Sequence, residues 1–519
     1  MQLGQVLANR PGRMRMPRPA ARLWLGIALL LAAGGIAAAA LIGPGAPGRP
    51  SVAKLAVHIR TPQPVTSVVS GSPATVSLEL TSALFTAAPA VVVAAGDRPA
   101  QVSAAVAAAT HAHAPLLLAA SSGQLSAAAR AEARSLRPTA VLAIGLPATT
   151  LSAQLPGIKV VTAPAALPRL AAPSGAAAGV LVLVHSGTSP DADIAEASAR
   201  LAGARVLTMP GYDPRAYPAA IRALAAARPR QVLAIGAAFG PKRILTSRIA
   251  VAETGVQLPG GGEVLFPMRR IVALYGNPGT PALGALGQQD LAAAITRAKA
   301  VAAQYRTLSH AAVVPGFEII ATVAEGSPGP SGSYSHVTPL AELRPWVRAA
   351  SRAGFYVILD LQPGRSSLLA QAKIYQSLLR RPNVGLALDP EWKLQPGQLP
   401  LHQIGSVSIS EVNSVVTWLA RLTEQYHLPQ KLLELHQFRL SMISGEARLD
   451  TRHDDLAIVI NMDGQGAPLT KLQTWNAITG AAPRHVFFGW KDFYAKDKPM
   501  LGPRQTIRHQ PRPVLISYQ

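Results

Sequence analysis

The hydrophobic pattern of residues 267–519 switches repeatedly between short apolar runs and longer stretches with helical spacing. Eight of the runs are rich in apolar and β-branched residues and have the length of buried strands. They cover residues 270–276, 311–320, 355–362, 384–391, 431–438, 456–464, 485–493 and 513–519. Four of the gaps between them place apolar side chains at i, i+3 and i+4, which predicts helices. These helices span residues 289–306, 339–353, 367–381 and 410–426.

Eight strand-and-helix steps in a segment of this length predict a (β/α)8-like barrel over residues 267–519. No helical pattern follows the last run at 513–519, so we expect the barrel to be irregular. A doubly wound parallel sheet has the same alternation and is the alternative. Both folds belong to the α/β class.

A second α/β region precedes this segment and is duplicated. The pentapeptide VLAIG at 141–145 recurs at 232–236, and the similarity extends with a period of 91 residues over copies at about 83–165 and 174–255. Each copy has three apolar runs separated by Ala-rich helical stretches. Continuous apolar strands that alternate with helices are typical of parallel sheets covered on both faces. The repeat therefore predicts two tandem βαβαβ units over residues 83–255.

The N-terminus has the pattern of a membrane anchor. Residues 1–22 contain five arginines and no acid, and the 21 residues 23–43 are uncharged. An apolar helix of that length spans a bilayer, and the flanking arginines place residues 1–22 in the cytoplasm. We predict a single-pass signal-anchor in the cell membrane with the bulk of the chain extracytoplasmic; cleavage as a signal peptide is the alternative. The many Pro and Gly residues of segment 44–82 predict a tether. Segment 256–266 is predicted to be a linker between the two α/β regions.

Composition narrows the classes of function. The chain has no cysteine, which excludes disulfides, thiolate metal sites, cysteine nucleophiles and a lipid-modified N-terminal cysteine. Its net charge is +23, and such a charge attracts anionic polymers and membrane headgroups. The sequence shows no zinc-finger or RNA-recognition signature and no basic run with interleaved aromatics, so we expect no nucleic-acid partner.

The first copy of the repeat carries a more specific pattern. Residues 89–120, PAVVVAAGDRPAQVSAAVAAATHAHAPLLLAA, combine a strand that ends in a Gly96–Asp97 turn, an Ala-rich helix and a second strand at 115–118. This stretch resembles the cell-wall-binding repeat 2 family of bacterial surface proteins, and the second copy departs from that pattern at the turn. The resemblance implies non-covalent attachment to cell-wall polysaccharide or another anionic wall polymer.

Candidate chemistry lies at the ends of the predicted barrel strands. In a (β/α)8 barrel the carboxyl ends of all strands meet at one mouth, where active sites form. Most of the strands finish in a polar side chain: Tyr275, Glu318, Asp360, Asp389, Glu391, Glu434, His436, Asp463, Lys491 and Asp492. Because residues i and i+2 share a face of a strand, Asp389 and Glu391 should point the same way. Carboxylates gathered with amides and aromatic rings predict a carbohydrate site.

Specific roles follow from this arrangement. We expect Glu391 to be a general acid whose pKa is raised by the nearby Asp389. Asp463 or Glu318 is the expected opposing carboxylate, at about 5 Å in a retaining enzyme and about 6.5–9.5 Å in an inverting one. These four residues are the catalytic candidates. The predicted substrate-binding residues are Asp360, Glu434, His436, Trp392, Trp490, Tyr275 and Gln437.

Two other interpretations of these side chains stay open. Asp and Glu at strand ends also cap helices and stabilise turns, and Asp463 in NMDGQG suits a turn. His436 and the carboxylates are potential metal ligands, but the sequence has no H-E-x-x-H or H-x-x-E-H spacing. We therefore expect no metal and no cofactor.

The stretch GLALDPEW at 385–392 is similar to the D-x-E ending of the fourth barrel strand in chitinase-like glycosidases. The second half of the chain also looks like an uncharacterised group of actinobacterial surface proteins. Together with the strand-end carboxylates, these resemblances predict a membrane-anchored extracytoplasmic protein with a glycoside-hydrolase-like barrel. The alternatives are a non-catalytic protein that binds cell-wall or other surface polymers, and a structural spacer for an exported assembly.

Overall fold

The computed structural model describes residues 55–171 and 177–519, which form a mixed α/β structure. The predicted cytoplasmic segment and membrane helix, residues 1–22 and 23–43, lie outside the described residues. Among the residues that are described, no helix combines the length and the apolar character needed to cross a membrane.

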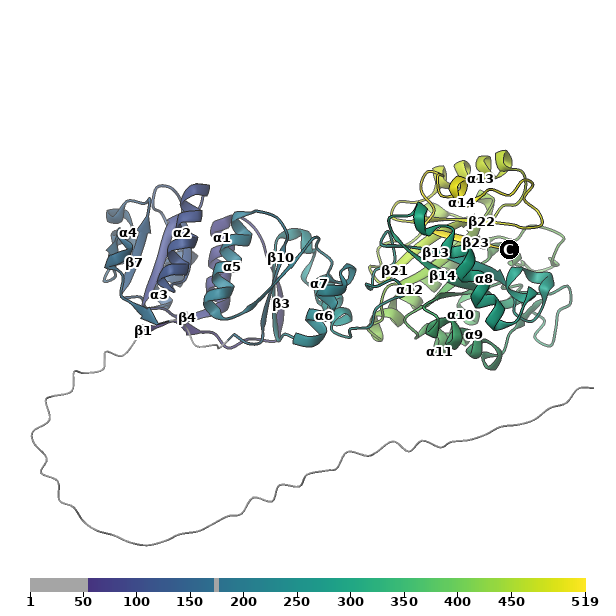
Figure 1. Cartoon of the computed structure of the whole chain (residues 1–519), viewed down its shortest axis with the longest axis horizontal. Coiled ribbons are helices and arrows are strands. Elements are labelled where there is room, and N and C mark those ends of the chain that lie inside the picture. The colour runs from purple at the N-terminus through teal and green to yellow at the C-terminus, as the bar shows by residue number, and fades with distance from the viewer. Residues whose placement is uncertain (1–54, 172–176) are drawn as a thin grey trace, which may run out of the picture. The chain divides into compact units, whose positions relative to one another are not determined.

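The region before the barrel contains two four-stranded parallel sheets (Figure 1). The strands of the first are β5 (Ala90–Ala95), β6 (Leu116–Ala119), β7 (Ala140–Ile144) and β8 (Lys159–Val161). Those of the second are β3 (Val65–Val69), β10 (Val180–His185), β11 (Arg205–Met209) and β12 (Gln231–Ile235). Their spatial orders are β6-β5-β7-β8 and β11-β10-β12-β3, so each repeat supplies the three predicted strands and each sheet has a fourth.

The fourth strand of the second sheet comes from the segment predicted as a tether. β3 pairs in parallel with β12, with Ser67 opposite Leu233, and takes the place that β8 takes beside β7 in the first sheet. It leads into α1 (Pro73–Leu84), which is capped by the side chain of Ser72. The tether prediction was therefore wrong for residues 55–82, because the prolines and glycines around the short run VTSVV resemble those of a loop.

Helices α1 and α5 (Pro190–Ala202) pack together between the two sheets (Figure 1). Val182 of β10 faces this shared core, whereas Leu181 and Leu183 face α6 (Pro218–Ala227) and α7 (Lys242–Ala252) on the other side. The other elements of the region are α2 (Pro99–Ala112), α3 (Ala127–Ser135), α4 (Ala148–Gln154), β1 (Leu55–Ala56), β2 (His58–Ile59), β4 (Phe85–Ala87) and β9 (Leu170–Ala171). The two repeats thus share one hydrophobic core.

The second half of the chain forms a closed barrel of eight parallel strands. They are β13 (Arg269–Gly276), β14 (Ala312–Ala324), β16 (Tyr356–Leu361), β17 (Val384–Leu388), β19 (Lys431–Gln437), β21 (Leu456–Met462), β22 (Phe487–Asp492) and β23 (Leu515–Tyr518). All eight predicted runs are barrel strands. The pairing of β13 with both β14 and β23 closes the ring, which confirms a (β/α)8-like barrel and excludes the doubly wound sheet.

Helices surround the barrel strands (Figure 1). They are α8 (Leu291–Ala303), α9 (Leu340–Arg352), α10 (Leu368–Ile374), α11 (Gln376–Leu379), α12 (Ile409–Gln425), α13 (Pro468–Ala481) and α14 (Pro503–Thr506). The four predicted helices are present, with the third divided into α10 and α11. The ring is irregular at a place that the sequence did not indicate, because the described residues between β19 and β21 form 3-10 turns and no α-helix. Short strands β15 (Ser335–Val337), β18 (Val407–Ser408) and β20 (Ile443–Ser444) lie in the loops.

The barrel interior is apolar at the amino ends of its strands. The buried cluster there includes Ile271, Val314, Leu432 and Leu515. The predicted linker 256–266 contributes Leu258, Leu265 and Phe266 to the same cluster, so it covers this end of the barrel. The guanidinium group of Arg269 holds the segment by donating hydrogen bonds to four of its carbonyl oxygens. The linker is therefore a packed part of the barrel.

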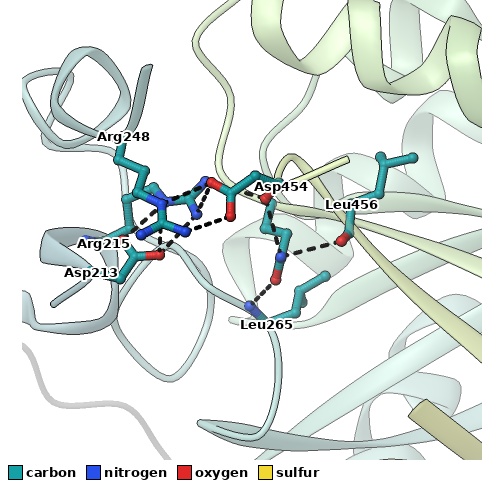
Figure 2. A network of polar contacts seen from close by, with 7 residues as sticks. Asp213, Arg215, Arg248, Leu265, Asp454 and Leu456 are labelled. Atoms are coloured by element: carbon teal, nitrogen blue, oxygen red, sulfur yellow. Dashed lines mark hydrogen bonds and ion pairs between the residues drawn. The ribbon is translucent and has the colours of Figure 1, made fainter. Parts of the chain in front are cut away.

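Figure 2 shows polar contacts between residues 213–248 and the same end of the barrel. Asp454, in the loop before β21, accepts hydrogen bonds from Arg215 at 2.6 Å and from Arg248 at 2.7 Å. Arg215 is buried and also donates to Asp213 at 2.8 Å. Two carboxylates thus compensate the buried guanidinium charge, and the network lies at the end of the strands opposite their carboxyl ends.

Candidate active site

A cavity of about 320 Å³ opens at the carboxyl ends of the barrel strands. Each of the eight strands, or the loop that follows it, contributes at least one side chain to its wall. Five predicted site residues line it: Tyr275, Asp389, Glu391, Trp392 and Asp463. Other lining residues with polar or aromatic side chains include Gln362, Phe438, Lys491 and Phe493. The prediction that distant strand ends meet at one mouth is therefore correct for this group.

Three carboxylates meet at this cavity. Asp389, Glu391 and Asp463 each offer one oxygen that lies within 4.8 Å of the other two. β17 ends at Leu388, and Asp389 caps the 3-10 turn Pro390–Trp392 by accepting a hydrogen bond from the Glu391 backbone N–H at 3.2 Å. This turn, rather than the strand alternation that we predicted, directs both side chains to the cavity. For Asp389 the capping interpretation is also correct.

The three carboxyl groups differ in their pKa values. Burial raises the pKa of Glu391 to about 7, and the carboxylate of Asp463 adds to the rise. We predicted that Asp389 is the chief cause of the raised pKa of Glu391, and that prediction was wrong. Burial also raises the pKa of Asp389 well above its ordinary range. Burial alone would raise the pKa of Asp463 too, but the hydrogen bond and the charge of His436 hold it below the ordinary value.

A second charged layer lies deeper in the barrel. Glu318, Asp360, Glu434 and His436 are all fully buried. His436 Nε2 lies 2.9 Å from Glu318 Oε1, 3.5 Å from Glu434 Oε1 and 3.9 Å from Asp360 Oδ1. Glu318, Asp360 and His436 each stand two positions before a cavity-lining residue of the same strand or the loop after it. The catalytic candidate Glu318 and these three predicted substrate-binding residues are thus enclosed beneath the cavity instead of forming its wall.

Burial dominates the electrostatics of the deep layer. It raises the pKa of Asp360 to about 6 and the pKa of Glu434 well above its ordinary value, and Glu318 adds to both shifts. Burial acts in the opposite direction on His436, yet the pKa of this imidazole is raised well above its usual range by Glu434, Asp463 and Glu318. The layer therefore gathers carboxyl groups around one imidazole in a fully buried place.

Lys491 brings a second cation to the site. Its ammonium group lies 3.3 Å from the centre of the Tyr275 ring and 4.0 Å from Asp463 Oδ2. The sequence places Lys491 among the polar residues at the ends of the strands, but we predicted no catalytic or substrate-binding role for it. The signal that identifies it is strand alternation, because the inward face of β22 includes position 491.

Two predicted substrate-binding residues face away from the cavity. Trp490 is fully buried against Trp475 of α13, with ring centroids 5.6 Å apart. Gln437 donates a hydrogen bond to Glu446 Oε2 at 2.8 Å. Each directly adjoins an inward residue of its strand, so the period of two turns it outward. The aromatic rings that do line the cavity beside Trp392 are those of Tyr275, Phe438 and Phe493.

The fold and the site define a mixed α/β protein whose barrel mouth combines carboxylates, a lysine and aromatic rings around a cavity. No family model, no curated protein and no solved structure matches the chain. Function is therefore inferred from the residues and the geometry of the site.

Proposed function

We propose that the barrel is a glycoside-hydrolase-like enzyme that acts on cell-wall or extracellular polysaccharide. One observation carries the proposal: Glu391 and Asp463 present carboxylate oxygens within 4.8 Å of each other at the wall of one cavity. Retaining glycosidases hold their two carboxyl groups about 5–5.5 Å apart, and inverting ones about 6.5–9.5 Å. The short separation favours the retaining reaction.

Glu391 is the proposed general acid. Burial raises its pKa to about 7, so a large fraction of this group is protonated at neutral pH. It donates the proton to the glycosidic oxygen as the bond breaks, while Asp463 attacks the anomeric carbon and forms a glycosyl ester. Glu391, then ionised, removes a proton from the water that hydrolyses the ester. Both carboxyl groups return to their starting states.

The rest of the cavity suits a sugar unit. Ligand sites combine apolar walls with a few polar groups that fix orientation. Here the rings of Trp392, Phe438 and Phe493 supply flat apolar surface, and Gln362 and Lys491 supply hydrogen-bond donors. At about 320 Å³ the cavity lies at the small end of ligand sites, which favours recognition of a terminal sugar.

The location of the protein is part of the proposal. The anchor pattern of residues 23–43 supports attachment to the cell membrane with the barrel outside. The net charge of +23 and the resemblance of residues 89–120 to cell-wall-binding repeats support binding of anionic wall polymer by the two-sheet region. Such binding would hold the barrel next to its polymeric substrate.

Hydrolysis of wall polysaccharide and of aryl glycosides by the purified full chain tests the proposal. Glu391→Gln should lower kcat about 10²–10⁴-fold, the usual contribution of general acid–base catalysis. Glu342→Gln, at an exposed position in the first turn of α9, is the matched control and should keep the full rate. Products with the anomeric configuration retained support the assigned roles. Undiminished activity of Glu391→Gln would remove the assignment.

Polymer binding without catalysis is the second candidate, and the net charge of +23 favours it. In that case the full chain sediments with isolated cell walls at low salt and dissociates at high salt, because salt screens surface charge. The full chain then releases no sugar, and the Glu391→Gln variant binds to the walls as strongly as the wild type does. Turnover that depends on Glu391 decides against this candidate.

A further inference from the structure

The deep layer of the barrel contains an arrangement that the proposed hydrolysis does not use. We propose that Glu318, Glu434 and His436 form a binding site for one divalent transition-metal ion. The three residues come from β14 and β19, and one ligand atom of each lies within 4.8 Å of the other two. All three side chains are fully buried.

The distances between these atoms match those between the ligands of one ion. Zn²⁺ binds imidazole nitrogen and carboxylate oxygen at roughly 2.0–2.2 Å, which places neighbouring ligand atoms about 3.3–3.6 Å apart in a tetrahedral site and about 2.8–3.1 Å apart in an octahedral one. His436 Nε2 lies 2.9 Å from Glu318 Oε1 and 3.5 Å from Glu434 Oε1. Asp360 Oδ1 lies 3.9 Å from the same nitrogen, and Tyr275 donates to the other oxygen of Asp360 at 3.0 Å. Asp360 therefore has an oxygen available as a fourth ligand.

These ligand atoms lack the hydrogen bonds expected of buried polar groups. Among the described residues, His436 Nε2, both oxygens of Glu318, Glu434 Oε2 and Asp360 Oδ1 have no hydrogen-bond partner. Glu318 Oε1 is only 2.9 Å from His436 Nε2, but the angle between the two groups is unsuitable for a hydrogen bond. Leaving buried polar atoms unpaired is costly. One ion coordinated by all of them removes that cost.

The neighbouring side chains leave the ligand atoms free for an ion. His436 Nδ1 lies 3.0 Å from Asp463 Oδ2. An ion that binds at Nε2 displaces the proton of that nitrogen, while Nδ1 keeps its N–H for the hydrogen bond to Asp463. Metal-binding histidines almost always donate their other N–H to a carboxylate or carbonyl in this way. Asn461 donates to Glu434 Oε1 at 2.5 Å, and this hydrogen bond orients the carboxylate. The surroundings therefore have the pattern of a second coordination shell.

The donor set selects the kind of ion. Carboxylates with one imidazole and no thiolate suit Zn²⁺, Mn²⁺ or Fe²⁺, whereas Ca²⁺ takes about 6–8 oxygen ligands. The carboxylates at the cavity form the weaker candidate, because Lys491 Nζ already lies 4.0 Å from Asp463 Oδ2. The missing H-E-x-x-H spacing carries no weight here, since closure of the barrel and not helix spacing brings β14 and β19 together.

An ion at this place would fix the imidazole ring of His436 and so the position of Asp463 at the cavity wall. The proposal concerns binding, however, and stands whether or not the barrel hydrolyses glycosides. Hydrolysis assays on the same samples report on the proposed function separately.

Metal uptake by the full chain tests the inference. Protein treated with a chelator and dialysed is titrated with Zn²⁺ or Mn²⁺, and bound metal is measured by mass spectrometry. One ion per chain is expected, with Tm raised by about 2–5 °C at a 100-fold excess over Kd. Glu434→Gln should weaken binding at least about 100-fold. Glu263→Gln changes a buried glutamate at the opposite end of the barrel and should bind as the wild type does.

A second measurement does not depend on the folding of a variant. Pulsed electron paramagnetic resonance of the wild-type chain with bound Mn²⁺ should show coupling to the nitrogen of one imidazole. The proposal is overturned if neither ion binds stoichiometrically, if Glu434→Gln binds with unchanged affinity, or if the nitrogen coupling is missing.

Discussion

The two ends of the barrel interior accommodate buried charge in opposite ways. At the amino end, cations are bound by backbone carbonyl oxygens: Arg269 donates to the linker, and Lys431 donates to the carbonyls of residues 381 and 382. At the carboxyl end, carboxylates face one another in two layers, with His436 and Lys491 as the cations among them. The same eight strands connect both ends.

This difference determines which end of the barrel keeps atoms available for a ligand. A buried charge that backbone groups fully satisfy stabilises one conformation and has no free atom for a ligand. Carboxylates that face a cavity keep free atoms and perturbed pKa values, which is the usual state of catalytic groups. The contrast agrees with the general division in (β/α)8 barrels, where the amino end serves stability and the carboxyl end carries the chemistry.

The largest expected effect comes from a charge placed where the amino end offers no partner. Ile271 is fully buried in the apolar cluster and lies on β13, between β14 and β23. Ile271→Asp should lower the free energy of unfolding by more than about 4 kcal/mol, because a buried carboxylate without a partner is among the most destabilising changes. Urea unfolding of the purified full chain measures the loss.

Leu283→Asp is the matched control at the carboxyl end. Leu283 is half-buried and lines the cavity, so a carboxylate there stays in contact with water. The change should cost less than about 1.5 kcal/mol. Equal losses for the two substitutions would show that the two ends tolerate a new charge equally well.

The second prediction concerns a charge at the amino end that lacks such partners. Glu263 is fully buried, and within the described residues neither of its carboxylate oxygens has a hydrogen-bond partner. Burial raises its pKa from 4.5 to about 8. Within that pH window the folded protein keeps a proton that the unfolded chain has released. The free energy of unfolding therefore falls as pH rises through the window.

Glu263→Gln removes the titrating group at nearly constant shape. The stability of the variant relative to the wild type should grow by about 1.4 kcal/mol per pH unit within the window and level off above pH 8. Urea unfolding in a series of buffers across the window measures this slope. If the difference in unfolding free energy between the variant and the wild type does not change with pH, the carboxyl group of Glu263 has hydrogen-bond partners in the folded protein, as the guanidinium group of Arg269 has.

The fold of the barrel was predictable because each strand is a continuous apolar run bounded by polar residues. β3 was not, since its pairing joins residues 65–69 to 231–235 and no local pattern records a contact over that separation. The packed role of segment 256–266 was also hidden, because its glycines and prolines resemble those of a loop while only a few residues, such as Phe266, are large and apolar.

The candidate site was predictable as far as strand ends and alternation determine it. Of these rules, position at a strand end identified Asp389, Glu391 and Asp463, which line the cavity, and alternation did not, because a 3-10 turn orients the first two. The two rules do not give depth: β14 continues to Ala324, so Glu318 lies in the deep layer and not beside Glu391. The prediction that Trp490 binds substrate was wrong for a different reason. It rested on the aromatic side chain and did not take into account that Trp490 directly adjoins the inward-facing Lys491.

The pH dependence of catalysis extends the comparison to the mouth of the barrel. The proposed mechanism requires protonated Glu391, whose pKa is raised to about 7. The value of kcat/KM should therefore fall about tenfold per pH unit above about pH 7. Rates measured from acidic to alkaline buffer on an aryl glycoside give this profile, and a rate that stays constant to pH 9 would exclude Glu391 as the acid.

The smallest expected effect separates burial from charge as the cause of that pKa. Burial raises it, whereas the positive charge of Arg439 lowers it, and Arg439 is exposed, so its substitution leaves the packing intact. Arg439→Gln should move the alkaline limb of kcat/KM upward by about 0.3 pH unit at low salt and by less at high salt, which screens an exposed charge. A limb that does not move at either salt concentration would mean that the charge of Arg439 does not contribute to the pKa of Glu391.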